Sequence, residues 1–394
     1  MSTHTGGESL FDRAREVAPL IREHAVEAEQ RRQLAAAVVD AMLDAGLYDM
    51  SRPRGFGGLE ADPVTMFRVV EEVARHDSAA AWNLQISVGA IPLLAWLPDE
   101  GAAEILSGRP STILGGSFTP SSPAVAVDGG YRLTGQWPFV SGAHHCHWLV
   151  FILQVTNGGT LQANDQGVPV SRFMFLPADK AEILDTCDTL GMRGTGSHDV
   201  VVKDVFVPER HTAIVAPLER PGKAFQGPLY RLAAWPAIGL LAAPSLGIAR
   251  AAIDEVIELA RIKTPGLTSS PLARRQVAQR QVAQAEAMLA AGRAYLFDTF
   301  ERNWQAVQRG EPLTQTQKNG LQLSATHALS CAAKAIDLVH TVAGTSAIRN
   351  ARKFPQWFRD VHTMTQHGFV SASRYESVGA LMLGAESDWA FLQL

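Results

Sequence analysis

The 394-residue sequence predicts an α+β fold in three parts: an N-terminal helical domain over residues 1–112, a middle β-barrel domain over 113–215 and a C-terminal four-helix bundle over 216–394. In the first and last parts, apolar residues recur every three or four positions, which indicates helices that cover a core. The middle part has short runs of β-branched and aromatic residues between turn residues, which is typical of strands. Because helices and strands are segregated along the chain, the sequence does not favour a doubly wound parallel sheet.

Three amphipathic helices are expected in the first part, over 11–30, 33–48 and 64–85. Asp62 and Pro63 mark the start of the third helix. An aspartate oxygen accepts hydrogen bonds from first-turn N–H groups, and proline suits the first helical position.

The middle part begins with an expected hairpin over 124–142 that turns at Asp128-Gly129-Gly130. Turn residues bound further expected strands over 147–155, 171–178 and 199–208. From about residue 222, long Ala-, Gln- and Arg-rich segments such as 271–300 predict the helices of the bundle.

Composition and charge exclude several classes of protein. The net charge of −4 and the pI near 6.3 provide no basic surface for nucleic acid. Three cysteines without a Cys-x-x-Cys pair suit the reducing cytoplasm, and the N-terminus has no apolar signal core. The uncharged stretch 232–249 approaches the length of a membrane span, but its prolines and small residues favour a buried core helix. We therefore expect a cytoplasmic protein with no nucleic-acid or membrane partner.

The stretch GMRGTGSHDV at 191–200 is rich in glycine, yet it does not match the loops that bind phosphate. A P-loop places a lysine before its Ser or Thr and a helix after it, whereas Ser197 lacks that lysine and precedes a strand. A dinucleotide-binding loop follows a strand and precedes a helix, which is the reverse order. From these residues alone, a tight turn that leads into a strand is the simplest interpretation.

The run His144-His145-Cys146-His147 suggests metal ligands at first sight. In an extended chain His145 and His147 point one way and His144 the other, and no nearby carboxylate completes a ligand set. We predict no metal site.

Four motifs together carry a resemblance to a known family: GFGGLE at 55–60, GQWPFVSGA at 135–143, LGMRGTGSHDVVVKDVFVP at 190–208 and FRDVHTMTQHG at 358–368. In this order, over nearly the whole chain, they resemble the acyl-CoA dehydrogenase superfamily. The likeness is greatest to its oxygenase branch, the two-component flavin-dependent monooxygenases. The resemblance implies the acyl-CoA dehydrogenase-like fold, with helical domain, β-barrel and bundle in that order.

The resemblance also implies the residues of a flavin site. In a strand, Trp137, Phe139 and Ser141 would share one face toward the flavin, with the Ser141 hydroxyl at its N5/O4 edge as a catalytic group. The glycine-rich turn would lie beside the flavin rather than bind phosphate. Further expected cofactor contacts are Trp82, Arg193, Ser197, Lys263, Thr345, Ser346 and Gly368. The expected substrate pocket comprises Trp82, Asn83, Phe118 and His367.

In the family that this sequence resembles, one sequence position distinguishes dehydrogenases from oxygenases. Dehydrogenases of the family use a glutamate base in a Tyr-Glu-Gly motif, and here that position is Gln366-His367-Gly368. No Asp or Glu occurs between Glu219 and Asp254, where some members place the base instead, and Glu376 lies too far along the chain. We predict that His367 is the proton-transfer group of an oxygenase.

The predicted reaction uses reduced FMN or FAD, O2 and a C4a-(hydro)peroxyflavin to oxygenate a small aromatic, amine or sulfur substrate. FMN is slightly favoured because the Arg-x-x-Phe-Gly signature of dinucleotide binding is absent. With no nicotinamide-binding βαβ unit in the sequence, a separate NAD(P)H:flavin reductase is expected to supply the reduced flavin. The resemblance further implies a homotetramer. The alternatives are an acyl-CoA dehydrogenase or oxidase with a displaced base, and a catalytically silent flavin-binding protein.

Overall fold

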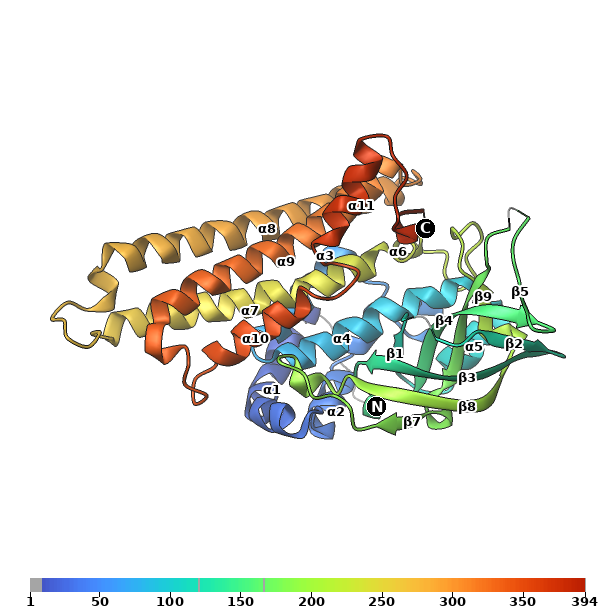
Figure 1. The fold of residues 1–394 in the computed structure, drawn as a ribbon, viewed down its shortest axis with the longest axis horizontal. Helices are drawn as coiled ribbons and strands as arrows, with labels where there is room; N and C mark the ends of the chain where they lie inside the picture. Colours follow the sequence, from blue (N-terminus) through green and yellow to red (C-terminus); the bar gives the residue numbers. More distant parts are fainter. Residues whose placement is uncertain (1–8, 120, 166, 394) are drawn as a thin grey trace.

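The structure is a computed structural model that describes residues 9–119, 121–165 and 167–393. Three long helices lie side by side and extend away from the sheet, and α4 (Ser78–Ala90) lies between these helices and the strands (Figure 1). The predicted order of helices, strands and helices is confirmed. The predicted divisions after residues 112 and 215 fall in connecting segments, and we propose to keep them as the domain boundaries.

From residue 9 onward, the N-terminal part contains five α-helices, and Asp62 caps one of them as predicted: its Oδ1 accepts a hydrogen bond from Thr65 N at 2.9 Å. The helix expected over 64–85 is instead two helices. Asp77 starts the second of these, because its carboxylate accepts hydrogen bonds from the N–H groups of Ala79 and Ala80. The helices are α1 (Leu10–Arg31), α2 (Ala36–Asp44), α3 (Pro63–Ala74), α4 and α5 (Asp99–Ser107).

The described residues of the middle part form a nine-stranded sheet with the order β7-β8-β3-β2-β4-β6-β9, to which β1 and β5 add on β4. The predicted barrel does not close among these residues, since the end strands β7 and β9 do not pair with each other. The strands are β1 (Leu114–Ser117), β2 (Ala124–Val127), β3 (Gly130–Val140), β4 (Trp148–Asn157), β5 (Thr160–Leu161), β6 (Ser171–Pro177), β7 (Glu182–Leu184), β8 (His198–Pro208) and β9 (Thr212–Ile214).

The predicted hairpin is formed by β2 and β3, which pair antiparallel with Val127 opposite Gly130. Gly129 has φ +73°, a conformation that favours glycine. The sheet folds over its own apolar core, in which Leu133, Phe151 and Val202 are fully buried. This core is separate from the larger one that joins the two helical parts.

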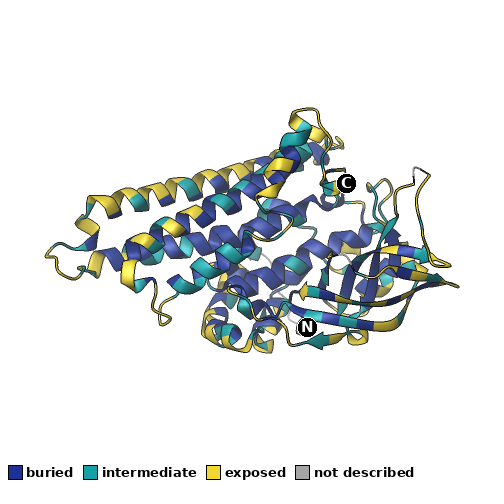
Figure 2. Cartoon of the chain, in the orientation of Figure 1, coloured by how far each residue is buried: buried dark blue, intermediate teal, exposed yellow. Residues whose placement is uncertain are grey.

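Up to residue 393, the C-terminal part contains three long helices, α7 (Trp235–Ile262), α8 (Gln276–Gln308) and α9 (Gln315–Ala343). Two short helices, α10 (Phe354–Met364) and α11 (Ser373–Met382), pack on α9 in place of the single fourth helix of the predicted bundle, and α6 (Pro228–Arg231) precedes α7. Figure 2 shows α7 as mostly buried, whereas α8 presents an exposed outer face.

Among the described residues, two helical segments are long and apolar enough to cross a membrane, Ser78–Trp96 and Trp235–Ile262. The fold buries 94% of the first and 83% of the second over their most apolar windows. The stretch 232–249 therefore belongs largely to a core helix, as its prolines and small residues predict.

Candidate functional site

A chain of hydrogen bonds connects α4, the end of β3 and the glycine-rich turn. Trp82 Nε1 donates to Ser141 Oγ at 3.0 Å, and Ser141 Oγ lies 2.8 Å from Ser197 Oγ. Ser197 Oγ is 2.6 Å from Thr195 Oγ1, which donates to the carbonyl oxygen of Met192 at 2.7 Å. We call these four side chains, Trp82, Ser141, Ser197 and Thr195, the hydroxyl relay.

The glycines of the 191–197 turn permit close packing against helices. A Cβ at Gly191 would collide with the carbonyl of Arg359 in α10, and one at Gly194 would lie 3.0 Å from Ala79 Cβ in α4. The turn contains glycines because two helices pack closely against its backbone and leave no room for side chains. This role of glycine does not involve phosphate binding.

Asp360 in α10 fixes this turn, although the sequence analysis assigned it no role. Its carboxylate accepts a hydrogen bond from Met192 N at 2.6 Å and another from Ser78 Oγ of α4. Burial raises the pKa of Asp360 to about 7, with its two hydrogen bonds acting in the opposite direction. The signal that could have revealed it is a carboxylate on the buried side of an amphipathic helix, where it needs partners.

Asn83 follows Trp82 on α4 and lies against the backbone of Gly142. Its side chain is 6% exposed, yet neither its Oδ1 nor its Nδ2 has a hydrogen-bond partner among the described residues. Because buried amides are nearly always hydrogen-bonded, this side chain is suited to a polar ligand atom.

His367 follows α10 and contacts two aromatic rings. Its ring centre lies 5.5 Å from that of Trp82, edge to face, and 5.9 Å from that of Phe369. The side chain is half-buried, and desolvation lowers the pKa of His367 to about 4, so the ring is neutral at pH 7. Nδ1 accepts a hydrogen bond from Phe369 N at 3.4 Å, which leaves the ring hydrogen on Nε2.

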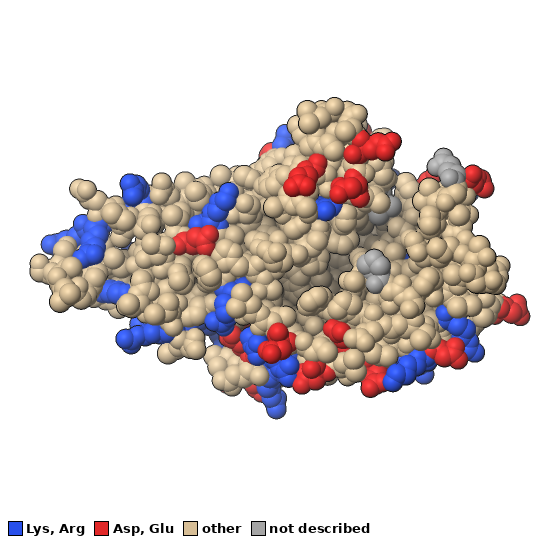
Figure 3. Space-filling model, in the orientation of Figure 1, with Lys and Arg blue, Asp and Glu red and all other residues tan. Residues whose placement is uncertain are grey.

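Aromatic side chains continue from His367 toward the sheet. The Phe369 ring centre lies 6.1 Å from that of Phe118, which in turn contacts Phe173 at 6.3 Å. On the other side, Phe369 contacts Trp389 at 4.9 Å. Figure 3 shows the surface hollowed between the C-terminal helices and the sheet, with no Lys, Arg, Asp or Glu coloured inside the hollow. The described side chains around Phe369 are thus largely aromatic, with the Arg374 guanidinium over the Trp389 ring, 3.9 Å from its centre.

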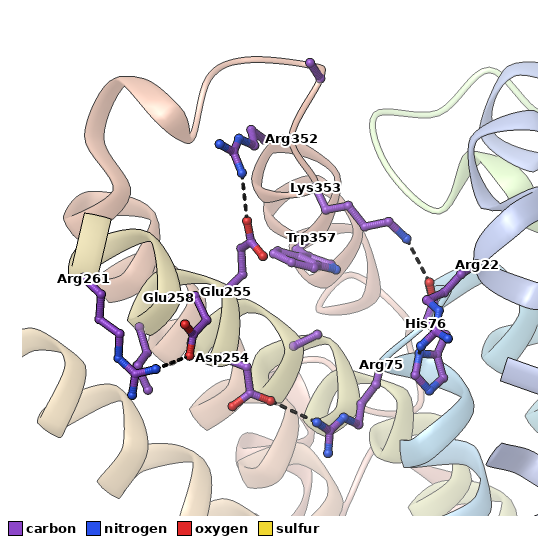
Figure 4. Close-up of a pocket in the computed structure, with 13 residues that line it drawn as sticks. Arg22, Arg75, His76, Asp254, Glu255, Glu258, Arg261, Arg352, Lys353 and Trp357 are labelled. Carbon is purple, nitrogen blue, oxygen red and sulfur yellow. Dashed lines mark hydrogen bonds and ion pairs between the residues drawn. The ribbon is translucent and has the colours of Figure 1, made fainter. Parts of the chain in front are cut away.

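A cavity of about 750 Å3 lies apart from these residues, between α1, α3, α7 and α10, and its lining is charged. Figure 4 shows its carboxylates paired with arginines: Arg75 with Asp254 at 3.0 Å, Arg352 with Glu255 at 3.2 Å and Arg261 with Glu258 at 2.5 Å. Each of these three carboxylates is thus paired with an arginine. None of the sequence-predicted site residues lines this cavity.

Comparisons with known proteins place the chain and its fold in a family. Residues 9–108 match the acyl-CoA dehydrogenase N-terminal domain, and residues 239–372 match the acyl-CoA dehydrogenase C-terminal domain. An indole-3-acetate monooxygenase from Pseudomonas putida is 33% identical over 384 residues, which cover 96% of this chain and 93% of the relative. The chain belongs to the acyl-CoA dehydrogenase family.

Within this family the chain is a flavin-dependent monooxygenase. The oxygenase subunit HsaA of a flavin-dependent monooxygenase from Rhodococcus jostii is 27% identical over 363 residues, 89% of this chain and 91% of the relative. XiaF from Streptomyces sp., solved in complex with FADH2 and glycerol, has the same fold, with a TM-score of 0.89, 24% identity and 96% coverage of both chains.

The monooxygenase carries the half-buried His367 where the resemblance leads us to expect the glutamate of a dehydrogenase, and His367 forms no ion pair among the described residues. Glu376 lies on the exposed side of α11, as expected of a surface carboxylate. The structure thus brings Trp82, Asn83, Ser141, Ser197 and His367 to one region, with Phe118 joined to it through Phe369.

The prediction that Trp137, Phe139 and Ser141 share one strand face is wrong. Trp137 is fully buried in the core of the sheet, where it stacks on Phe151 with ring centres 4.2 Å apart. Phe139 is 64% exposed and has φ +57°. The register of β3 on β8 shifts between Trp137 and Val140, and this irregularity breaks the alternation of side chains. The Trp137 ring therefore cannot face a flavin in this arrangement.

Other predicted cofactor residues lie apart from the hydroxyl relay. Arg193 pairs with Asp188 at 2.8 Å and donates to Thr189 O at 2.9 Å, so its guanidinium is tied to its own loop. Lys263 Nζ donates to Ala343 O at 2.6 Å and to Ser346 Oγ at 3.0 Å. Lys263 and Ser346 follow the ends of α7 and α9 that point away from the sheet (Figure 1).

The remaining two predicted cofactor residues, Thr345 and Gly368, are exposed. Thr345 follows the end of α9 beside Ser346. Gly368 follows His367, and a Cβ added to this glycine would meet no atom of the described residues within 4 Å. Neither makes a contact that assigns it to the site within one chain.

The histidines at 144–147 have separate partners. His147 Nδ1 accepts from Ile113 N at 3.0 Å, His145 Nε2 bonds to Leu34 O at 3.1 Å, and the His144 ring packs edge-on against His198. Over the described part of the chain, no group of three or more His, Cys, Asp or Glu is arranged to hold a metal ion.

Proposed function

We propose that this monooxygenase is the oxygenase component of a two-component system and adds one oxygen atom to a small aromatic substrate. The observation that carries the proposal is the environment of His367. A neutral imidazole stands among Trp82 and Phe369, where the family's dehydrogenases place a carboxylate. Without that base, removal of a substrate α-proton is not supported.

The residues present fit a reduced flavin. Asn83 offers an unpartnered buried amide, Ser141 offers a hydroxyl beside it, and the Trp82 ring offers an apolar surface. When bound, reduced flavin supplies the two electrons that activate O2. The half-buried, aromatic surroundings of His367 limit water at the reacting centre, and its Nε2–H can donate a hydrogen bond to an oxygen atom there.

The choice of an aromatic substrate rests on the walls of the site. Trp82, Phe118 and Phe369 present ring faces and edges near His367. The Pseudomonas putida relative is named for indole-3-acetate, an aromatic compound. Amine and sulfur substrates are the other classes that the flavin chemistry admits.

The reductant is proposed to reach the site as reduced flavin from a separate NAD(P)H:flavin reductase. The glycines at 55–58 lie in a loop between helices, and those at 191–196 precede a strand, so neither cluster forms a strand–loop–helix unit for a nicotinamide. We expect the purified protein to consume no NADH or NADPH, with or without added FMN.

The test supplies reduced FMN, either chemically or by a flavin reductase, and measures O2 uptake and products from indole-type and phenolic substrates. Product should form only when reduced flavin is supplied. Product formation driven by NADH alone would show that the electrons enter by a route within this chain. Reduction of an electron acceptor by a CoA thioester would instead favour a dehydrogenase.

We further propose that the active form is a cytoplasmic homotetramer. Lys263 and Ser346 follow the ends of α7 and α9 that point away from the sheet, whereas Ser141 follows β3, and we propose that Lys263 and Ser346 contact the flavin of a second copy of the chain (Figure 1). The exposed apolar side chains Ile262, Leu267 and Ile348 at this end support such an interface. FMN is the proposed form, because the segment 261–266 lacks the dinucleotide signature.

Light scattering at micromolar concentration should give about four times the chain mass of 42.5 kDa. Replacement of Leu267 and Ile348 by Asp should lower the mass, because charges at an apolar interface are poorly solvated. A monomeric wild-type protein that retains full activity would contradict this proposal.

A further inference from the structure

We infer that Thr195 and Ser197 set the redox preference of the flavin site, by fixing Ser141 as a hydrogen-bond acceptor that suits reduced flavin. The inference rests on the proposed function, since it concerns the form of the cofactor that the site selects. Thr195 and Ser197 act through Ser141 and are thus positioning residues.

The direction of the hydroxyl relay follows from its last member. Thr195 Oγ1 has one hydrogen, and it donates that hydrogen to the carbonyl oxygen of Met192, which can only accept. Toward Ser197, Thr195 must therefore accept, and Ser197 donates its only hydrogen. Ser141 then donates its own hydrogen to Ser197.

Because its only hydrogen is donated to Ser197, Ser141 Oγ can otherwise only accept hydrogen bonds through its two lone pairs. One accepts the Trp82 Nε1–H, which is a donor in every state of the indole. The other points away from both partners and can only accept. Any group that meets Ser141 Oγ at this free position must bring a hydrogen.

The family resemblance leads us to expect Ser141 at the N5/O4 edge of the flavin, and the two redox forms of flavin differ in this respect at N5. Oxidised flavin has a lone pair on N5, and reduced flavin has an N–H group there. A Ser141 oxygen that can only accept matches reduced N5–H, whereas it would face oxidised N5 with lone pair against lone pair. The same orientation also disfavours contact with the flavin O4 carbonyl, which accepts in either form.

The surroundings hold the relay in one direction. Thr195 is 1% exposed and Ser141 is 8% exposed, whereas Ser197 between them is half-buried, so the Thr195 hydroxyl that sets the direction is the one best shielded from water. The Met192 carbonyl at the end of the relay also accepts from Thr195 N at 3.1 Å, and Met192 N is held by Asp360. Because a fixed backbone carbonyl sets the direction, the relay cannot reverse without losing this bond.

Replacement of Thr195 by valine tests the inference, since valine keeps the shape and removes the hydroxyl. Ser197 would then lose its acceptor and could donate to Ser141, which would free the Ser141 hydrogen for oxidised N5. Dissociation constants of the purified apoprotein for oxidised FMN and, under anaerobic conditions, for dithionite-reduced FMN are measured by titration. We expect the ratio of the oxidised to the reduced constant to fall by about tenfold in T195V.

Three further variants make the result specific. Thr195→Ser restores a hydroxyl and should restore the wild-type ratio. Ser197→Ala removes the acceptor of the Ser141 hydrogen itself and should also lower the ratio of the oxidised to the reduced dissociation constant. Thr189→Val is the matched control, because Thr189 Oγ1 donates to the Gly191 carbonyl at 2.9 Å in the same loop but outside the relay; its ratio should stay at the wild-type value.

An unchanged ratio in folded T195V and S197A would overturn the inference, as would an equal fall in T189V. These outcomes do not involve turnover, so they are distinct from failure of the proposed function. That failure would appear as a wild-type protein that binds reduced flavin with the expected preference yet forms no oxygenated product.

Discussion

Replacement of His367 by alanine is expected to lower product formation by about 10²–10⁴-fold while the affinity for reduced flavin changes little. The ring is the polar side chain that faces Trp82 among otherwise aromatic neighbours, and its Nε2–H is free to act on an oxygen of the substrate or of activated O2. Steady-state product formation with a chemical supply of reduced FMN measures the effect. His362→Ala is the matched control, since His362 lies on the same segment but pairs with Asp337 at 2.9 Å near the surface.

The lowered pKa of His367 predicts how folding stability and product formation depend on pH. Because the pKa is about 4 in the fold and about 6.5 in an unfolded chain, the unfolded state binds more protons between these values. The contribution of His367 to stability is thus complete above pH 6.5 and is lost as the pH falls toward 4. Product formation should show no loss near pH 6.5 from this residue. A pH profile with a His367-dependent limb at 6.5 would mean that the ring is solvated in the working enzyme.

Ser141→Ala is expected to uncouple the reaction, with O2 released as H2O2 and product formation reduced by roughly 10²-fold. The substitution removes the acceptor of the buried Trp82 Nε1–H and leaves that donor without a partner, whereas Ser197 keeps its hydrogen bond to Thr195. The fraction of consumed O2 that appears as H2O2 gives the readout, alongside product yield.

Ser245→Ala provides a control for loss of a buried hydroxyl. Ser245 is fully buried in α7, where its Oγ donates to Ala242 O at 2.7 Å, apart from the site. It should leave the ratio of H2O2 to product unchanged. If Ser141→Ala kept that ratio as well, the hydroxyl would have no part in controlling the oxygen chemistry.

Local features of the fold were predictable from local features of the sequence. The Asp62 cap and the hairpin turn at Gly129 depend on the conformations of a few adjacent residues, so sequence neighbours suffice to predict them. The expectation of one helix over 64–85 is wrong, because the Asp77 cap competes with continued helical periodicity over the same residues.

The sequence by itself determined the α, β, α order, because periodicity is a property of the chain, and its resemblance to a known family implied the site positions Trp82, Ser141, Ser197 and His367. The tertiary structure alone decided which way side chains face and how they titrate. An irregularity against β8 separates Trp137 from Phe139, and Asp188 holds Arg193 within its own loop. Burial among residues distant in sequence sets the pKa of His367. Each of these depends on which surfaces pack together, and that is a property of non-local contacts that no short segment encodes.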